Sequence, residues 1–159
     1  MAKLVAGGVR LREQLDAKFK NRDRSSDGWI GDSAHSARVS DHNPDRLGWV
    51  HAVDIDQDFG RGRWRNGRNA RALADQIVKY AASGLPGSDR VKNAVYENQV
   101  ASGTYRSSWW RFRGSGYGHT QHIHVSFTSA AQRDGGVWPL PVLGVTSKQR
   151  RAWAKALAG

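Results

Sequence analysis

The sequence predicts an α+β domain with a small antiparallel sheet flanked by helices. Two segments, 50–56 and 122–127, alternate between apolar and polar residues in the way that is typical of strands. Between them, residues 70–81 carry the spacing of an amphipathic helix. The resulting order of helix, strand, helix and strands favours this class. The length of 159 residues fits one domain.

The first helix is predicted over residues 8–20. Apolar residues recur there at a four-residue step, at Leu11, Leu15 and Phe19, which gives the helix one buried stripe. Residues 21–32 are polar and rich in glycine, serine and aspartate, so we expect a loop.

A second irregular segment, 33–48, precedes the first strand. It is rich in histidine, aspartate, asparagine and arginine, and both Pro44 and Gly48 argue against regular structure. Because apolar and polar residues alternate after it, residues 50–56 are predicted to be a strand.

The second helix is predicted from one apolar face, formed by Ala70, Leu73, Ala74, Ile77, Val78 and Ala81. We expect it to end at 84–87, where glycine and proline cluster. Residues 91–100 are predicted to form one or two strands, and residues 122–127 another.

We divide the chain after residue 133. Residues 1–133 are the predicted functional domain. The composition changes in residues 134–159. A stretch with glycine and proline resembles a linker, and a short basic helix is predicted after it at 147–157. This tail either caps the domain or leads to a further module.

The composition excludes several classes of protein. The chain has no cysteine, which rules out disulfide frameworks, thiolate zinc sites and cysteine nucleophiles, so a metal site must use His, Asp or Glu. No apolar run approaches the roughly 18 residues that a membrane span needs, which excludes an integral membrane protein. The net charge of +11 favours polyanionic partners, either nucleic acid or the anionic polymers of a bacterial envelope.

Three histidines cluster at the last predicted strand: His119, His122 and His124. Alternate side chains of a strand share a face, so His122, His124 and Ser126 point away from the core. Two imidazoles on one face suit a metal site, in which one binds the ion and the other moves protons or holds substrate. The alternative is a pair of exposed histidines on a half-buried strand.

Two carboxylates share one face of the earlier strand. Asp54 and Asp56 lie there beside Ala52, and a small residue next to carboxylates leaves room for an ion. The alternative is a solvated face with one capping aspartate. In the preceding loop, Pro44 is expected to hold the imidazole of His42 in one direction. His35 lies in the same loop and has no such constraint.

Three motifs follow one another in the chain: Ser40-x-His42, then Ala52-x-Asp54, then His119-x-x-His122-x-His124. In this order they resemble the zinc D-alanyl-D-alanine carboxypeptidase superfamily, which includes murein endopeptidases and many phage endolysins. The strings Ser40–Asp45 and His119–Ser126 look most like peptidase domains from phages of actinobacteria. The resemblance covers residues 25–128 and implies the D-Ala-D-Ala metallopeptidase fold, which is hedgehog-like.

By this resemblance, His42, Asp54 and His124 are the ligands of one zinc ion per chain. Three protein ligands with one open position are what a catalytic zinc site requires. Such an ion lowers the pKa of a bound water to about 7 and polarises the scissile carbonyl. His122 and His119 match histidines of the family's active site that do not bind the metal.

The first departure from the family pattern is a longer spacing. His42 and Asp54 are twelve residues apart, further than is usual in the family. We expect the extra residues, around 44–50, to bulge as a loop.

The second departure concerns the general base. The family often has Asp or Glu three residues before the last ligand, where this chain has Gln121, which cannot accept a proton. The base is then His122, His119 or a carboxylate such as Asp56. We favour His122, because a neutral imidazole near the metal has a suitable pKa.

Arg38, four residues before His42, is a candidate for stabilising the oxyanion or binding a substrate carboxylate. The alternative is an ordinary solvated arginine. Trp109, Trp110 and Tyr117 precede the histidine motif and are candidates for the walls of a peptide cleft. Core packing is the alternative for at least one of them.

We therefore expect a zinc metallopeptidase, similar to a phage endolysin, that hydrolyses an amide bond in the stem peptide or crossbridge of bacterial peptidoglycan. Its basic surface would hold it on anionic wall polymers. We expect a monomer that neither inserts into membranes nor binds nucleic acid. The N-terminal apolar stretch is too short for a secretory signal, so we expect synthesis in the host cytoplasm and action on the wall after release.

Two alternatives remain open. Asp41-His42-Asn43-Pro44 resembles the start of a His-Asn-His nuclease motif, and the positive charge would suit DNA. That motif needs a later metal ligand, histidine or asparagine, on the next helix. Residues 66–83 contain no histidine, and their asparagines are Asn66 and Asn69. The other alternative is a wall-binding module that keeps the fold and has lost catalysis, which Gln121 would explain.

Overall fold

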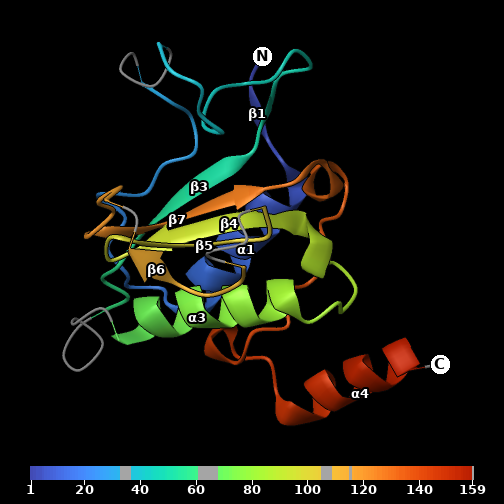
Figure 1. Ribbon diagram of the computed structural model, residues 1–159. Helices are drawn as coiled ribbons and strands as arrows, with labels where there is room; N and C mark the ends of the chain where they lie inside the picture. The colour runs from blue at the N-terminus through green and yellow to red at the C-terminus, as the bar shows by residue number, and fades with distance from the viewer. Residues whose placement is uncertain (33–36, 61–67, 105–108, 115, 159) are drawn as a thin grey trace.

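The computed structural model describes residues 1–32, 37–60, 68–104, 109–114 and 116–158, and every structural statement below concerns these residues. They form an α+β domain around a five-stranded sheet in the order β3-β7-β4-β5-β6 (Figure 1). Each neighbouring pair of strands is antiparallel. The strands are β3 (Ala52–Asp56), β4 (Val91–Tyr96), β5 (Gln99–Ser102), β6 (Arg113–Gly114) and β7 (His122–Phe127). The predicted class and small antiparallel sheet are confirmed.

Two helices, α1 (Ala6–Lys18) and α3 (Arg68–Ala82), cover one face of this sheet. Their apolar stripes pack against alternate residues of β3 and β7 in one core. Its fully buried members include Leu11, Leu15, Leu73, Ile77, Val53, Ile55, Ile123 and Val125. The residues between these on β3 and β7 therefore lie on the opposite face, and that face carries the candidate site.

The predicted strand 50–56 is two strands in the structure. Val50 ends β2 (Trp49–Val50), which pairs in parallel with the N-terminal β1 (Lys3–Leu4). Ala52 begins β3, which pairs with β7. The chain changes partner at His51, and alternation within one segment cannot reveal a change of partner.

The predicted strand region 91–100 is a hairpin of β4 and β5. Its turn residues, Glu97 and Asn98, have φ values of 49° and 63°, in the left-handed region. Two consecutive left-handed residues match the right-handed twist of a tight hairpin. The short strand β6 extends the sheet beyond β5 and was not predicted.

Residues 134–143, predicted as a linker, pack against the domain. Trp138 is fully buried, and its Nε1 donates to the carbonyl of Gly7 at 2.9 Å. The buried guanidinium of Arg90 stacks over the Trp138 ring at 4.2 Å and donates to the carbonyl of Gly136 at 2.7 Å. This segment therefore packs onto the domain, as the capping alternative for the tail expects.

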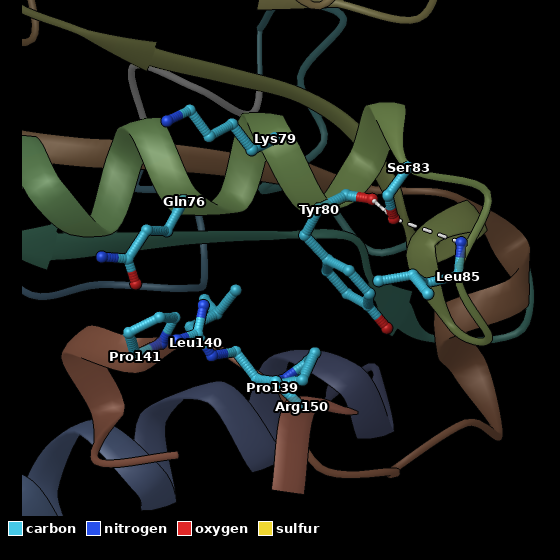
Figure 2. Close-up of a pocket in the computed structure, with 9 residues that line it drawn as sticks. All are labelled: Gln76, Lys79, Tyr80, Ser83, Leu85, Pro139, Leu140, Pro141 and Arg150. Carbon is cyan, nitrogen blue, oxygen red and sulfur yellow. Dashed lines mark hydrogen bonds between the residues drawn. The ribbon is translucent and has the colours of Figure 1, made fainter. Parts of the chain in front are cut away.

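The C-terminal helix α4 (Ser147–Ala158) follows this extension. A cavity of about 340 Å³ lies between α3, residues 139–141 and Arg150 of α4, and Figure 2 shows the residues that line it. Tyr80 and Leu85 supply part of its apolar wall, and Lys79 lines it as a basic group. The described residues that line it include no carboxylate or imidazole, so it offers no metal ligands.

In the described part of the chain, no helix is both long enough and apolar enough to cross a membrane.

Candidate metal centre

The pairing of β3 with β7 brings a carboxylate next to an imidazole. Asp54 lies directly opposite His124 in the antiparallel register, so both side chains emerge on the open face of the sheet. Asp54 Oδ1 is 3.0 Å from His124 Nδ1. The next pair, Asp56 with His122, places His122 Nε2 at 3.6 Å from Asp54 Oδ1.

His42 reaches the same point from the loop before β2. Gly28 pairs with Asp54 as an isolated antiparallel bridge, which lays the chain beside β3. The next carbonyl, that of Trp29, lies 3.1 Å from His42 Nδ1. When Nδ1 donates its proton to that carbonyl, the lone pair of the neutral ring lies on Nε2. His42 Nε2 lies 3.3 Å from Asp54 Oδ2 and 3.1 Å from His124 Nδ1.

The loop that carries His42 is closed by backbone and carboxylate contacts. Asp45 accepts hydrogen bonds from the amides of Leu47 and Trp49, at 2.8 and 2.9 Å. Gly48 has a φ of 83°, and a Cβ there would lie 2.9 Å from the carbonyl of Met1. The expected bulge between His42 and Asp54 is thus a compact turn.

Ser126 holds the other side of the His124 ring. The Ser126 side chain is 1% exposed, and its Oγ lies 2.9 Å from His124 Nε2. A proton on Nε2 that is donated to this hydroxyl leaves Nδ1 free to face Asp54 and His42.

The three groups polarise one another. Burial raises the pKa of the Asp54 carboxyl, but hydrogen bonds from His124 and His42 outweigh burial and hold that pKa well below its usual range. Burial lowers the pKa of His42, but the hydrogen bond and charge of Asp54 outweigh it and raise that pKa above its ordinary value. A carboxylate anion therefore lies between two imidazoles.

This donor set is suited to a divalent cation. Two imidazole nitrogens and a carboxylate are ligand types that zinc accepts, and the donors are 3.0 to 3.3 Å apart. Ligands about 2.0–2.1 Å from a tetrahedral ion are about 3.3 Å from each other. His42, Asp54 and His124, which the sequence analysis placed together, form a group that could hold a metal ion.

The remaining two predicted histidines adjoin this group. His119 Nδ1 lies 2.7 Å from His122 Nε2, and the His119 ring centroid is 5.2 Å from that of His124. Burial and the neighbouring His124 and His122 lower the pKa of His119 to about 4. His119 is therefore neutral at pH 7.

Asp56 does not take part in the centre. Its carboxylate accepts hydrogen bonds from the amide and hydroxyl of Ser26, at 3.1 and 2.6 Å, and from the hydroxyl of Ser25 at 3.2 Å. Asp56 is thus the capping aspartate that the sequence analysis gave as its alternative role.

The other predicted site residues differ in their placement. Arg38 is exposed, and its carbonyl accepts a hydrogen bond from Asn43 Nδ2 at 2.7 Å, so its role at the oxyanion stays a prediction. The Gln121 side chain is exposed as well. His35 and Asn66 lie outside the described residues.

An open cavity of about 320 Å³ lies beside the centre, lined among others by His119, His124 and Tyr117. Lys92 of β4 pairs with Asp41 at 2.7 Å in the wall between the sheet and the His42 loop.

The three aromatic residues proposed for the walls of a cleft have different surroundings. Tyr117 is exposed and lines the cavity. Trp110 is partly buried and packs against the core, as expected for at least one of the three. Trp109 is exposed, with its ring centroid 6.2 Å from that of Trp110.

The sequence analysis gave no role to two residues of the centre. Alternation placed Ser126 on the same face as His122 and His124, but did not identify it as a hydrogen-bond partner of His124. Trp29 acts through its carbonyl, and a backbone contact leaves no signal in the residue type.

Comparisons of the chain with protein-family models, with curated proteins and with solved structures found no match. The candidate site therefore rests on the geometry of its own residues.

Proposed function

We propose that the chain is a zinc-dependent peptidase of the D-alanyl-D-alanine carboxypeptidase superfamily, with the hedgehog-like fold of that group. Its substrate would be an amide bond in the stem peptide or crossbridge of bacterial peptidoglycan. One observation carries the proposal: His42, Asp54 and His124 converge on the open face of the sheet with donor atoms 3.0 to 3.3 Å apart.

Zinc fits this donor set, because imidazole nitrogen and carboxylate oxygen are its usual ligands in sites without cysteine. When bound, the ion would supply Lewis-acid activation of water and of the scissile carbonyl. The cavity beside His119 and His124 gives a peptide room to approach. Three protein ligands are typical of a catalytic site, whereas a structural site is closed by four.

His122 is the group best placed to accept the proton of the attacking water. Its Nε2 lies 3.6 Å from Asp54 Oδ1, on the open face and at the edge of the metal centre. His119, neutral at pH 7, lies 2.7 Å from the same nitrogen, so His122 Nε2 accepts the proton only when His119 is not donating to it. His122 can then return the proton to the leaving amine.

The positive charge supports attachment to the wall. The net charge is +11, and α4 contributes four basic residues without an acidic one: Lys148, Arg150, Arg151 and Lys155. Such a surface attracts anionic wall polymers. In this proposal the protein is a monomeric endolysin that acts on the wall after release from the host cytoplasm.

The proposal is tested on purified peptidoglycan by mass spectrometry of the released fragments. The untreated protein should create new peptide termini and leave the glycan intact, a chelator should abolish this activity, and added zinc should restore it. His124→Ala should be inactive. His51→Ala is the matched control, because His51 contacts Asp45 at 3.3 Å and lies outside the centre. Cleavage that survives both the chelator and His124→Ala would refute the proposal.

The same experiment addresses the alternatives. A wall-binding module without catalysis would be retained on the wall and release no new termini. For the nuclease, Asn69 lies on α3, which packs against the covered face of the sheet, so it does not converge with His42. A nuclease would also leave the grouping of His119, His122 and Asp54 without a role.

A further inference from the structure

We propose that Asp54, His119 and His122 form a second divalent-cation site, which shares Asp54 with the first. This inference rests on the proposed metal-dependent function, because both sites use the same carboxylate. It assigns to His119 and His122 a capacity beyond proton transfer.

The donor atoms of this second group converge. His119 Nδ1, His122 Nε2 and a carboxylate oxygen of Asp54 all lie within 4.8 Å of one another. The two nitrogens are 2.7 Å apart, and His122 Nε2 is 3.6 Å from Asp54 Oδ1. These two distances bracket the roughly 3.3 Å between ligands of a tetrahedral ion, and the third pair, His119 Nδ1 and the Asp54 carboxylate, lies within 4.8 Å.

The two oxygens of Asp54 face different histidines. Oδ2 lies 3.3 Å from His42, whereas Oδ1 lies 3.0 Å from His124 and 3.6 Å from His122. A carboxylate placed in this way can bridge two ions, and ions in two-metal sites are about 3.5–4 Å apart.

The backbone holds His119 at the centre against its own preference. Its φ is 55°, a left-handed conformation that is uncommon for a non-glycine residue. The turn of the β4–β5 hairpin fixes this segment: the amide of Glu97 donates to the carbonyl of His119 at 3.0 Å, and the amide of Asn98 donates to that of Gly118 at 2.8 Å. Strained residues persist where the surrounding structure over-determines them, and they cluster at functional sites.

The two sites should differ in affinity. The first has a carboxylate between two imidazoles, one of them, His42, only 5% exposed. The second adds two imidazoles to a carboxylate whose charge the first ion already neutralises in part, and its His122 side chain is 26% exposed. The second ion should therefore bind after the first and more weakly.

Occupation of the second site has a consequence for catalysis. An ion there takes the lone pair of His122 Nε2, the same atom that would accept the proton in the proposed reaction. The two roles exclude each other at any moment, so excess zinc should inhibit hydrolysis.

The test is a calorimetric titration of the metal-free protein with Zn²⁺. The unmodified chain should bind two equivalents, the second at least tenfold more weakly than the first. His119→Ala should keep the tight equivalent and lose the weak one, whereas the control His51→Ala should keep both. Imidazole nitrogen NMR of the unmodified chain gives a second measurement that needs no variant: the first equivalent should shift His42 and His124, and the second should shift His119 and His122.

Three outcomes of the titration would contradict the second site. Saturation at one equivalent would overturn the second site and leave the proposed function intact. A weak equivalent that survives His119→Ala, or that disappears in His51→Ala, would place the ion elsewhere and also overturn it. No binding at all would refute the first site, and with it the proposed function.

Discussion

Removal of one hydroxyl should weaken metal binding without touching a ligand. In Ser126→Ala, the His124 ring loses its partner at Nε2, which lies 2.9 Å from the serine Oγ. When the hydroxyl accepts the Nε2 proton, it favours the tautomer whose Nδ1 can bind the metal. Because Ser126 is 1% exposed, water cannot readily replace the lost hydroxyl.

The expected magnitude follows from the role of such partners. Loss of a hydrogen bond that orients a metal-binding histidine usually costs about 10–100-fold in metal affinity. This corresponds to about 1.4–2.8 kcal/mol of binding free energy. We expect Ser126→Ala to lie within this range for the tight equivalent.

The assay is competition for zinc with a chromophoric chelator of known affinity. Ser102→Ala is the matched control, because Ser102 is also a fully buried strand serine, and its Oγ accepts from the amide of Thr104 at 3.0 Å, away from the centre. The control should lose stability but keep its zinc affinity. Equal zinc affinity in Ser126→Ala and the unmodified protein would refute the assignment of Nδ1 as the metal-binding atom of His124.

Three further predictions follow from the same structure. His122→Ala should lower kcat by about 10²–10⁴ while the tight zinc stays bound, and Gln121→Glu should be tolerated, as steady-state kinetics with metal analysis can measure. Lysis of whole walls should weaken as the salt concentration rises, because the Debye screening length falls to about 3 Å at 1 M salt. Cleavage of a small soluble peptide should change much less. Arg90→Met should lose about 3–5 kcal/mol of unfolding free energy in urea titrations, because the carbonyl of Gly136 and other partners of the buried guanidinium are left unpaired.

Other outcomes would contradict these predictions individually. If His122→Ala keeps near-normal turnover and His119→Ala is inactive, the base is His119. Equal salt sensitivity for walls and for the soluble peptide would mean that the charge does not serve wall attachment. An unchanged urea midpoint in Arg90→Met would show that residues 134–138 do not depend on the guanidinium.

Periodicity predicted the long elements well. The strand 122–127 coincides with β7, and the helix 70–81 lies within α3. Alternation also predicted that His122 and His124 leave the core face. These features depend on residues close in sequence, where spacing decides which side chains share a face.

Contacts between segments that are far apart in the chain could not be predicted from local sequence patterns. The register that sets Asp54 opposite His124 depends on how β3 and β7 pair, and no local pattern states it. The carbonyl of Trp29 acts through the backbone and has no residue signature. The glycines and prolines of residues 135–141 predict either a linker or a cap on the domain, without deciding between them. Their packing depends on Arg90, more than forty positions earlier.

An anomalous difference map, recorded at the zinc edge from crystals of the protein with one equivalent of zinc, would locate the ion directly. We expect one strong peak about 2.0–2.1 Å from His42 Nε2 and His124 Nδ1, with Asp54 as the third ligand. A peak at other residues, or none at this centre, would contradict this expectation.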